Sequence, residues 1–396
     1  GVVFSLMAVI QAVGFFFGHG SGNFISRTLG GHHPEEAGQM AATGFFCALA
    51  TGGVIAVLGL LFLDPLARAL GSTETILPYA RDYMRFILIG APYMTASLVL
   101  NNQLRFQGSA VYGMVGIASG AVLNIALDPI FIFTLDMGVA GAALATILSQ
   151  LVSFCLLLVG CTRGGNLHIR ISNVRLQKRF FREILRGGLP SLARQGLSSV
   201  AAICLNHAAQ PYGDAAIAAM SVVSRIMNFA SSALIGFGQG FQPVCGFNYG
   251  AQLYGRVRRA FWFCVKVSTV CLVVIAVAGA CFSSQLIALF RDDPVVVEYG
   301  TTALRLQWLS FPTVGFVTMS NMMLQTIGRT VPATFVAMAR QGIFFIPLIL
   351  VLPGFWGMLG VQLSQPLADL LTFVIAVPIQ LRVLRQMARL PEAERL

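Results

Sequence analysis

Two carboxylates lie within long apolar stretches of this sequence, where an ionised side chain is costly and tends to be protonated, paired or functional. The first, Asp128, follows Asn124 by four residues and directly precedes Pro129. Residues at i and i+4 share a helix face, and the proline leaves a backbone carbonyl free nearby. The pair is therefore a candidate site for a proton or a small cation. A polar pair that caps or kinks the helix is the alternative.

Asp369 is the second carboxylate, and it lies within the last apolar stretch. An internal repeat, described below, places Gln150 at the equivalent position, and polar residues at both depths favour a lined cavity. A simple interhelical hydrogen bond is an equally good interpretation. Arg194 and Gln195 follow Pro190 in another apolar stretch. An arginine there must face protein, water or a carboxylate, so either a structural ion pair or a cavity role is open.

Amide side chains close two apolar stretches that match each other in the repeat. They are Asn101, Asn102, Gln103 and Gln107 in the first stretch, and Asn321 and Gln325 in the second. We expect them mainly to cap helix ends and to bond neighbouring helices, with Gly108 and Gly328 as C-terminal caps. Asn321 and Gln325 are also candidates for lining a substrate cavity, together with Asp369, Arg194 and Gln195.

Composition shows that membrane helices must position these residues. The chain has 396 residues, of which 56% are hydrophobic and 10% charged, whereas a soluble domain carries about 25% charged residues. Its apolar stretches are long enough to span a hydrocarbon core of about 30 Å as helices, and alternation typical of a β-barrel is absent. We therefore predict an all-α polytopic membrane protein with about eleven transmembrane helices.

Breaks at Gly and Pro divide the chain into these helices. They are expected near residues 2–29, 35–63, 76–106, 110–133, 138–161, 180–210, 214–248, 253–282, 295–327, 330–352 and 357–386. A polar, basic stretch interrupts the series after the fifth helix. It predicts an N-terminal lobe (1–161), a cytoplasmic linker (162–179) and a C-terminal lobe with a basic tail (180–396).

A glycine element occurs once in each lobe. Its glycines recur at a constant offset of 220 residues: Gly18, Gly20 and Gly30 match Gly238, Gly240 and Gly250. Pro92 and Pro312 keep the same offset. A long repeat in an apolar chain is typical of transporters built from two like halves. The second copy opens with a helix whose partner would precede residue 1, so we also expect a first helix that this chain lacks.

The distribution of basic residues predicts the orientation. Most of the 26 Lys and Arg residues lie in the linker and in loops at one end, and the net charge is +11. By the positive-inside rule that end and the C-terminus are cytoplasmic, and we expect no nucleic-acid partner. Both glycine elements then run the same way, so two six-helix lobes should be related by a pseudo-twofold axis along the membrane normal.

Five motifs in combination resemble the multidrug and toxin extrusion (MATE) family, and within it the bacterial MepA-like branch. They are residues 18–27, 105–108, Asn124-x3-Asp128-Pro129, Pro190-x3-Arg194-Gln195 and 242–251. The resemblance implies two six-helix lobes and export of cationic, amphipathic drugs in exchange for protons or sodium ions. It also implies an ion site at Asn124 and Asp128, with Thr146 on the next helix; the aspartate that the family's first helix adds has no counterpart here.

A secondary antiporter is therefore the leading hypothesis: a monomer in the cell (inner) membrane, with organic cations as substrates and no cofactor or metal besides the coupling ion. A flippase for lipid-linked oligosaccharides is the nearest rival, because Arg194, Arg225 and Arg340 would favour a cationic cavity. An enzyme is disfavoured, since no HExxH, GxSxG or paired catalytic carboxylates occur. The two-lobe repeat disfavours a channel.

Overall fold

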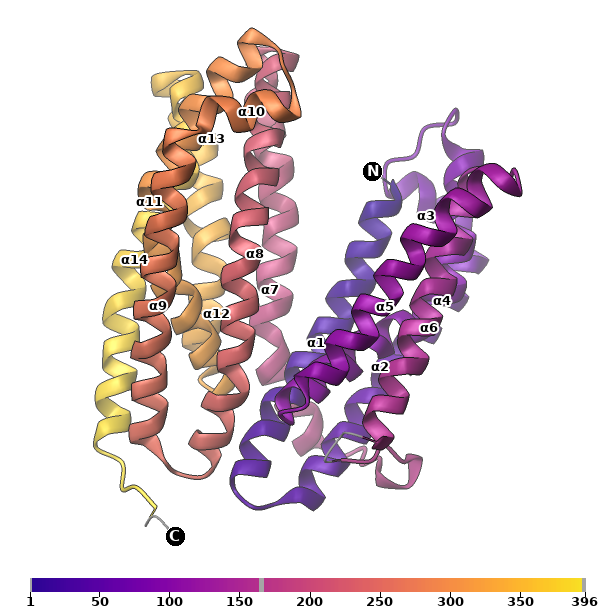
Figure 1. Cartoon of the computed structure of the whole chain (residues 1–396), viewed down its shortest axis with the longest axis vertical. Coiled ribbons are helices and arrows are strands. Elements are labelled where there is room, and N and C mark those ends of the chain that lie inside the picture. Colours follow the sequence, from indigo (N-terminus) through magenta and orange to yellow (C-terminus); the bar gives the residue numbers. More distant parts are fainter. Residues whose placement is uncertain (1, 164–166, 394–396) are drawn as a thin grey trace. The chain divides into compact units, whose positions relative to one another are not determined.

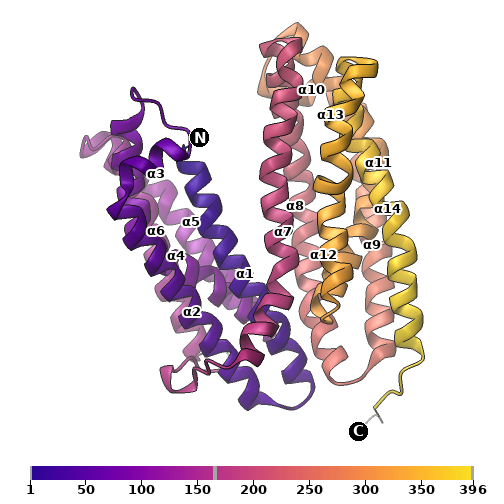
Figure 2. The ribbon, with the colours of Figure 1, turned by 180° about the vertical axis from the view of Figure 1, so that it is seen from behind.

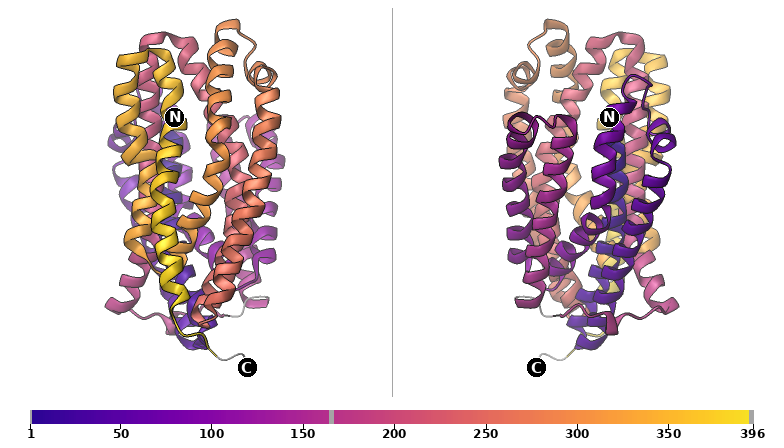
Figure 3. Two further views of the ribbon diagram at one scale, coloured as in Figure 1. Left: turned by 90° about the vertical axis from the view of Figure 1, so that its left-hand side faces the viewer. Right: turned by 90° about the vertical axis from the view of Figure 1, so that its right-hand side faces the viewer.

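The architecture is taken from a computed structural model that describes residues 2–163 and 167–393. These residues form helices and turns with no strand, which confirms the predicted all-α class. By its contacts the chain divides into two compact units, Gly1–Leu192 and Ala193–Leu396. Within each unit the long helices run roughly along one direction (Figure 3).

The first unit contains six long helices or parts of them, one short helix and two irregular turns (Figure 1). In chain order they are α1 (Val2–Gly30), α2 (Pro34–Leu61), α3 (Leu63–Ala69), α4 (Leu77–Phe106), α5 (Ala110–Pro129), the π-helical turn η1 (Ile130–Thr134), α6 (Val139–Arg163), the 3-10 turn η2 (Ile171–Asn173) and the start of α7 (Lys178–Ala209).

The second unit contains the rest of α7 and a similar series. In chain order this series is the 3-10 turn η3 (Gln210–Tyr212), α8 (Asp214–Gly250), α9 (Tyr254–Cys281), α10 (Ser283–Phe290), α11 (Pro294–Thr326), α12 (Thr330–Met338), the π-helical turn η4 (Ala339–Phe344), α13 (Phe345–Trp356) and α14 (Met358–Ala388). Helices α13 and α14 pack side by side (Figure 2).

The order of elements in the second unit repeats that in the first. Helices α1, α2, α4 and α6 correspond to α8, α9, α11 and α14, and a π-helical turn follows α5 as one follows α12. The short helices α3 and α10 also occupy matching places, although the sequence did not predict them. The long helices therefore follow the 220-residue repeat, whereas η4 lies about ten residues earlier than the offset from η1 would place it, and α13 has no separate counterpart.

One helix in each unit forms a hub that its neighbours surround. Helix α4 contacts α1, α2, α3, α5 and α6, and α11 contacts α8, α9, α10, α12 and α14. A helix enclosed by protein does not need an apolar surface on every side, and α11 accordingly buries Gln307, Ser310 and Asn321. These two hubs form the centres of the two cores.

Nine helical segments in the described ranges are long and apolar enough to cross a membrane, against eleven predicted. The two that fall short are α7 and α11, and both exist as long helices where the sequence predicted them. The first turns of α7 carry Lys178, Arg179 and Arg182, and α11 contains the buried polar residues of a hub. The shortfall therefore reflects polarity rather than missing helices.

The start of α7 packs on the first unit. Arg27 of α1 pairs with Glu183 of α7 at 3.1 Å, and the backbone N–H of Arg175 in the preceding linker donates to the hydroxyl of Thr43 at 2.9 Å. These contacts place the division between the units inside α7, after Leu192. The division falls within the predicted C-terminal lobe (180–396), and the predicted lobes (1–161 and 180–396) remain predictions.

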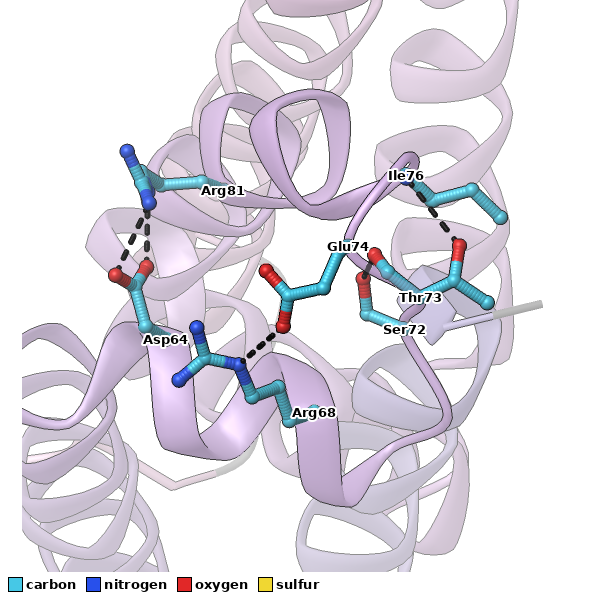
Figure 4. A network of polar contacts seen from close by, with 7 residues as sticks. All are labelled: Asp64, Arg68, Ser72, Thr73, Glu74, Ile76 and Arg81. Atoms are coloured by element: carbon cyan, nitrogen blue, oxygen red, sulfur yellow. Dashed lines mark hydrogen bonds and ion pairs between the residues drawn. The ribbon is translucent and has the colours of Figure 1, made fainter.

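Charged residues hold the turn between α3 and α4 (Figure 4). The guanidinium of Arg81 donates two hydrogen bonds to the carboxylate of Asp64, at 2.8 and 3.0 Å, and Arg68 donates to Glu74 at 3.1 Å. The side chains of Arg81 and Asp64 are 39% and 40% exposed, so their pair contributes at most about 1 kcal/mol. It fixes the short helix α3 against the start of α4.

The glycine element brings α1 close to α4 and α8 close to α11. A Cβ atom on Gly18 would lie 2.7 Å from the Asn102 side-chain nitrogen, and one on Gly238 would collide with the Met322 sulfur. Asn102 and Met322 are themselves related by the 220-residue offset. The element therefore serves the same packing function in both units, as small residues at membrane helix interfaces commonly do.

We expect Gly20→Ala to destabilise the protein and its repeat partner Gly240→Ala to leave stability unchanged or slightly raised. A Cβ atom on Gly20 would collide with the backbone carbonyl of Ile184, whereas nothing lies within 4 Å of one on Gly240. Such overpacking costs about 1–3 kcal/mol, and an exposed helical Gly→Ala change gains up to about 1 kcal/mol. Thermal melting of the two purified variants tests this; equal midpoints would contradict it.

Candidate functional site

The Asn124–Asp128 pair lies near the end of α5, within the membrane-crossing segment Ala110–Thr134. Both residues are half-buried. The side-chain Oδ1 atom of each is buried and accepts no hydrogen bond from the described residues. Asp128 is thus a carboxylate in an apolar segment that no neighbouring donor or cation in the described chain neutralises. An unpaired charge is costly in an apolar segment, so such a carboxylate is a candidate for binding a proton or a cation.

Thr146 lies on α6, the helix that packs against α5. Its hydroxyl donates to the backbone carbonyl of Ala142, one turn earlier in the same helix, at 3.0 Å. The structure therefore places the threonine on the neighbouring helix, as the spacing predicted, but does not join it to Asp128 by a hydrogen bond. Its part in an ion site stays a prediction.

Asp369 differs from Asp128 because neighbours satisfy its charge. Only 3% of it is exposed, and its Oδ1 atom accepts from the Arg340 Nε atom at 2.7 Å and from the Gln365 Nε2 atom at 2.8 Å. The Ser310 hydroxyl donates weakly to Oδ2 at 3.5 Å. This cluster, called the Asp369 cluster below, joins α11, η4 and α14 through a buried ion pair.

The π-helical turn η4 supplies the cation of this cluster. Arg340 lies in that turn, with 29% of its side chain exposed. An extra residue in a helical turn changes the direction in which the side chains project, and such turns are frequent at functional sites. The repeat offset puts Gly120 where Arg340 stands, so the first unit has no arginine at the matching position.

Sequence reasoning missed Gln365 and Ser310 as partners of Asp369. In Gln365-x3-Asp369, as in Asn124-x3-Asp128, an amide lies one helical turn before a carboxylate. This spacing could have identified Gln365 as a partner of Asp369. Arg340 was singled out as an intramembrane arginine but without a partner. Its side chain meets Asp369 from a different helix, so only the folded structure reveals the pair.

Arg194 is engaged by an amide instead of a carboxylate. Its Nη1 atom donates to the Asn321 Oδ1 atom at 2.8 Å, and the Asn321 Nδ2 atom donates to the Ala333 carbonyl at 2.7 Å. These bonds join α7, α11 and α12. Gln325 lies one turn beyond Asn321 and is 1% exposed, whereas Gln195 is half-buried. Asn321 therefore joins neighbouring helices here, as amides closing these helices were expected to do, whereas the role of Gln325 stays a prediction.

A duplicated bundle of membrane-crossing helices with intramembrane carboxylates is typical of a membrane transporter built from two like halves. Comparison with known proteins narrows this class. The model of the MatE family matches residues 1–130 and, a second time, residues 190–351. The chain belongs to the MatE family, and the family match occurs once in each half of the repeat.

Curated relatives agree with this assignment. The multidrug export protein MepA of Staphylococcus haemolyticus (strain JCSC1435) is 28% identical over 94% of this chain and 82% of its own length. MepA of Staphylococcus aureus (strain MRSA252) is 26% identical with the same coverage. These relatives are named for export rather than for an enzymatic reaction. The MepA-like branch that the motifs suggested is therefore confirmed.

Solved structures share the fold. An outward-facing multidrug resistance MATE transporter of the MOP superfamily superimposes with a TM-score of 0.93, at 25% identity, over 98% of this chain and 88% of its own. A MOP superfamily transporter from Pyrococcus furiosus, described as having a binding pocket of reverse polarity, superimposes with a TM-score of 0.92 at the same identity and coverage. The chain is accordingly a multi-pass membrane transporter.

Proposed function

We propose that this protein is a secondary active antiporter that exports cationic, amphipathic drugs or toxins in exchange for protons or sodium ions. Membership of the MatE family and similarity to multidrug export proteins support export of small molecules. The single observation that supports ion coupling is Asp128, an intramembrane carboxylate with a buried oxygen and no partner in the described residues. The proposal includes a monomer in the cell membrane with a cytoplasmic C-terminus.

Asp128 would couple transport by changing its charge. An ionised carboxylate in an apolar segment is costly, and a bound proton or cation removes that cost. Because a ligand shifts a conformational equilibrium by its difference in affinity between states, the bound ion would favour the state in which Asp128 is most enclosed. Asn124 supplies a second unpartnered oxygen, and Thr146 would add its hydroxyl on rotating away from Ala142. A proton needs one such oxygen, whereas a sodium ion needs several.

The proposed substrate-lining residues are Asp369, Arg194, Gln195, Asn321 and Gln325. In this structure Asp369 is paired with Arg340, and Arg194 is bonded to Asn321. These groups would meet a substrate only after local rearrangement of their bonds. Aromatic and methionine side chains near them would hold a lipophilic cation loosely, through its charge and its apolar surface.

The alternative of a flippase for lipid-linked oligosaccharides depends on arginines that are available to a pyrophosphate. Arg340 is neutralised by Asp369, and Arg194 donates to Asn321, so two of the three candidate arginines are already engaged. This favours drug export. Thermal stabilisation of the purified protein by ethidium, and not by lipid-linked precursors, would support that choice; the reverse pattern would favour the flippase.

Ethidium efflux from energised cells tests the antiport proposal. In sodium-free buffer, continued efflux that a proton uncoupler stops indicates proton coupling. Efflux that requires added sodium and survives the uncoupler while a sodium gradient is maintained indicates sodium coupling. Efflux that needs neither gradient would overturn the antiporter assignment. Cells without the protein provide the background rate.

A further inference from the structure

Helix α9 carries charge of one sign. Its 28 residues contain no Asp or Glu. Its basic residues are Arg256, Arg258, Arg259 and Lys266. None of the four forms an ion pair with the described part of the chain. Anions from outside the protein can therefore bind to this helix.

Part of this charge is collected in an open surface pocket of about 530 Å³ near the start of α9. The pocket, called the α9 pocket below, is lined by Gly255, Arg258, Arg259, Trp262, Phe263 and Lys266. Arg258, Trp262 and Lys266 follow one another at intervals of four residues and so share one helix face. Cations and aromatic rings are thus interleaved along a single stripe.

One side chain that lines the pocket, Arg258, has a hydrogen-bond donor without an acceptor. The Arg258 Nε atom is buried, yet no acceptor in the described residues receives its hydrogen bond. A buried guanidinium N–H without an acceptor is costly, and a phosphate oxygen is the acceptor that this group suits best. The backbone N–H of Gly255, at the N-terminal end of α9, already has an acceptor, because it donates to the carboxylate of Glu392.

Apolar side chains continue the stripe toward the middle of the membrane. Phe263 in the pocket lining is 63% exposed, and beyond the pocket three valines of α9 are more than half exposed: Val270 (64%), Val274 (63%) and Val277 (59%). Lys266 is exposed within the same membrane-crossing segment, so its ammonium group must extend to the headgroup region. Trp262 lies between Arg258 and Lys266 along the helix, and tryptophan is typical of the membrane interface.

We propose that the α9 pocket binds one anionic diacyl phospholipid. Its phosphate would accept hydrogen bonds from Arg258, Arg259 and Lys266, and its acyl chains would lie along the exposed valines of α9. Charge complementarity selects an anionic headgroup. The apolar stripe favours a lipid over a soluble phosphate, because one lipid molecule can contact both the basic side chains and the valines, whereas a soluble phosphate can contact only the basic side chains. The α9 pocket lies within the second unit, and lipid binding there does not depend on the coupling ion.

Native mass spectrometry of the purified, delipidated protein tests this. The protein is titrated separately with phosphatidylglycerol and phosphatidylethanolamine of identical chains. We expect phosphatidylglycerol to bind at least tenfold more tightly, and the double variant Arg258→Gln/Lys266→Gln to lose that preference. The matched control Arg382→Gln/Arg385→Gln removes the same charge from α14 and should bind as the unmodified protein does. Lys266→Arg should retain binding.

A single variant and a soluble phosphate compound are tested as well. Lys266→Gln alone alters an exposed side chain and should weaken phosphatidylglycerol binding even if the double variant folds poorly, which its melting midpoint without lipid would show. Glycerol phosphate is titrated in parallel and should bind weakly. Equal binding of the two lipids, unchanged binding by Lys266→Gln, or glycerol phosphate binding as tightly as the lipid would each overturn the proposal.

Discussion

Replacing Asp128 by Asn is expected to reduce gradient-driven ethidium efflux to the level of cells that lack the protein. Asparagine preserves the shape and polarity of the side chain but cannot ionise, so the site can no longer alternate between charged and neutral forms. The half-buried position of Asp128 and its unpartnered oxygen make this the largest functional effect that the structure predicts. Efflux rates, normalised to the amount of protein in the membrane, measure it.

Asp136→Asn is the matched control for this prediction. Asp136 lies in the exposed turn that follows η1, with φ of 53°, a backbone conformation that asparagine adopts readily. The change in charge is identical, but no enclosed site is affected, so efflux should be unchanged. Asn124→Ala should retain part of the activity. Full efflux by Asp128→Asn at normal membrane levels would remove Asp128 from the mechanism.

Replacing Arg340 by Met is expected to cause the largest loss of stability. It leaves the carboxylate of Asp369, which is 3% exposed, without its cation. Breaking a buried ion pair from one side costs about 3–5 kcal/mol; we expect the lower end, about 3 kcal/mol, because Gln365 and Ser310 still donate to the carboxylate. The melting midpoint of the purified variant should fall well below that of the unmodified protein.

The double variant Arg340→Met/Asp369→Leu separates the ion pair from simple loss of packing. Well-packed apolar residues often replace a buried pair at little cost, so the double variant should regain most of the lost stability. Asp369→Leu alone should cost less than Arg340→Met, since the arginine is 29% exposed and keeps access to polar surroundings. A double variant that is less stable than either single variant would contradict a role for charge pairing.

Much of the fold could be predicted because long apolar stretches leave few alternatives. The third long helix illustrates the accuracy: residues 76–106 were predicted where α4 spans Leu77–Phe106. The short helices α3 and α10 were missed because each has only seven or eight residues and adjoins a long apolar run. Periodicity over so few residues cannot be separated from the end of the longer helix.

The candidate site could be predicted from the sequence only where its residues are close together along one helix. Asn124 and Asp128 share a helix turn, so their spacing alone brings them together. Arg340 and Asp369 meet across two helices, and a π-helical turn sets the direction of the arginine. Such a turn leaves no clear mark in the apolar pattern, so the sequence could not show which intramembrane carboxylate is neutralised and which is not.

The enclosed position of α11 has a consequence for how the chain is assembled in the membrane. Alone in lipid this helix would expose Gln307, Ser310 and Asn321 to hydrocarbon, and it is too polar to enter the bilayer by its own partitioning. Its neighbours α8 and α9 are synthesised earlier and contact it in the finished structure. We therefore expect the insertion of α11 into the membrane to depend on these earlier helices, which would shelter its polar side chains from lipid.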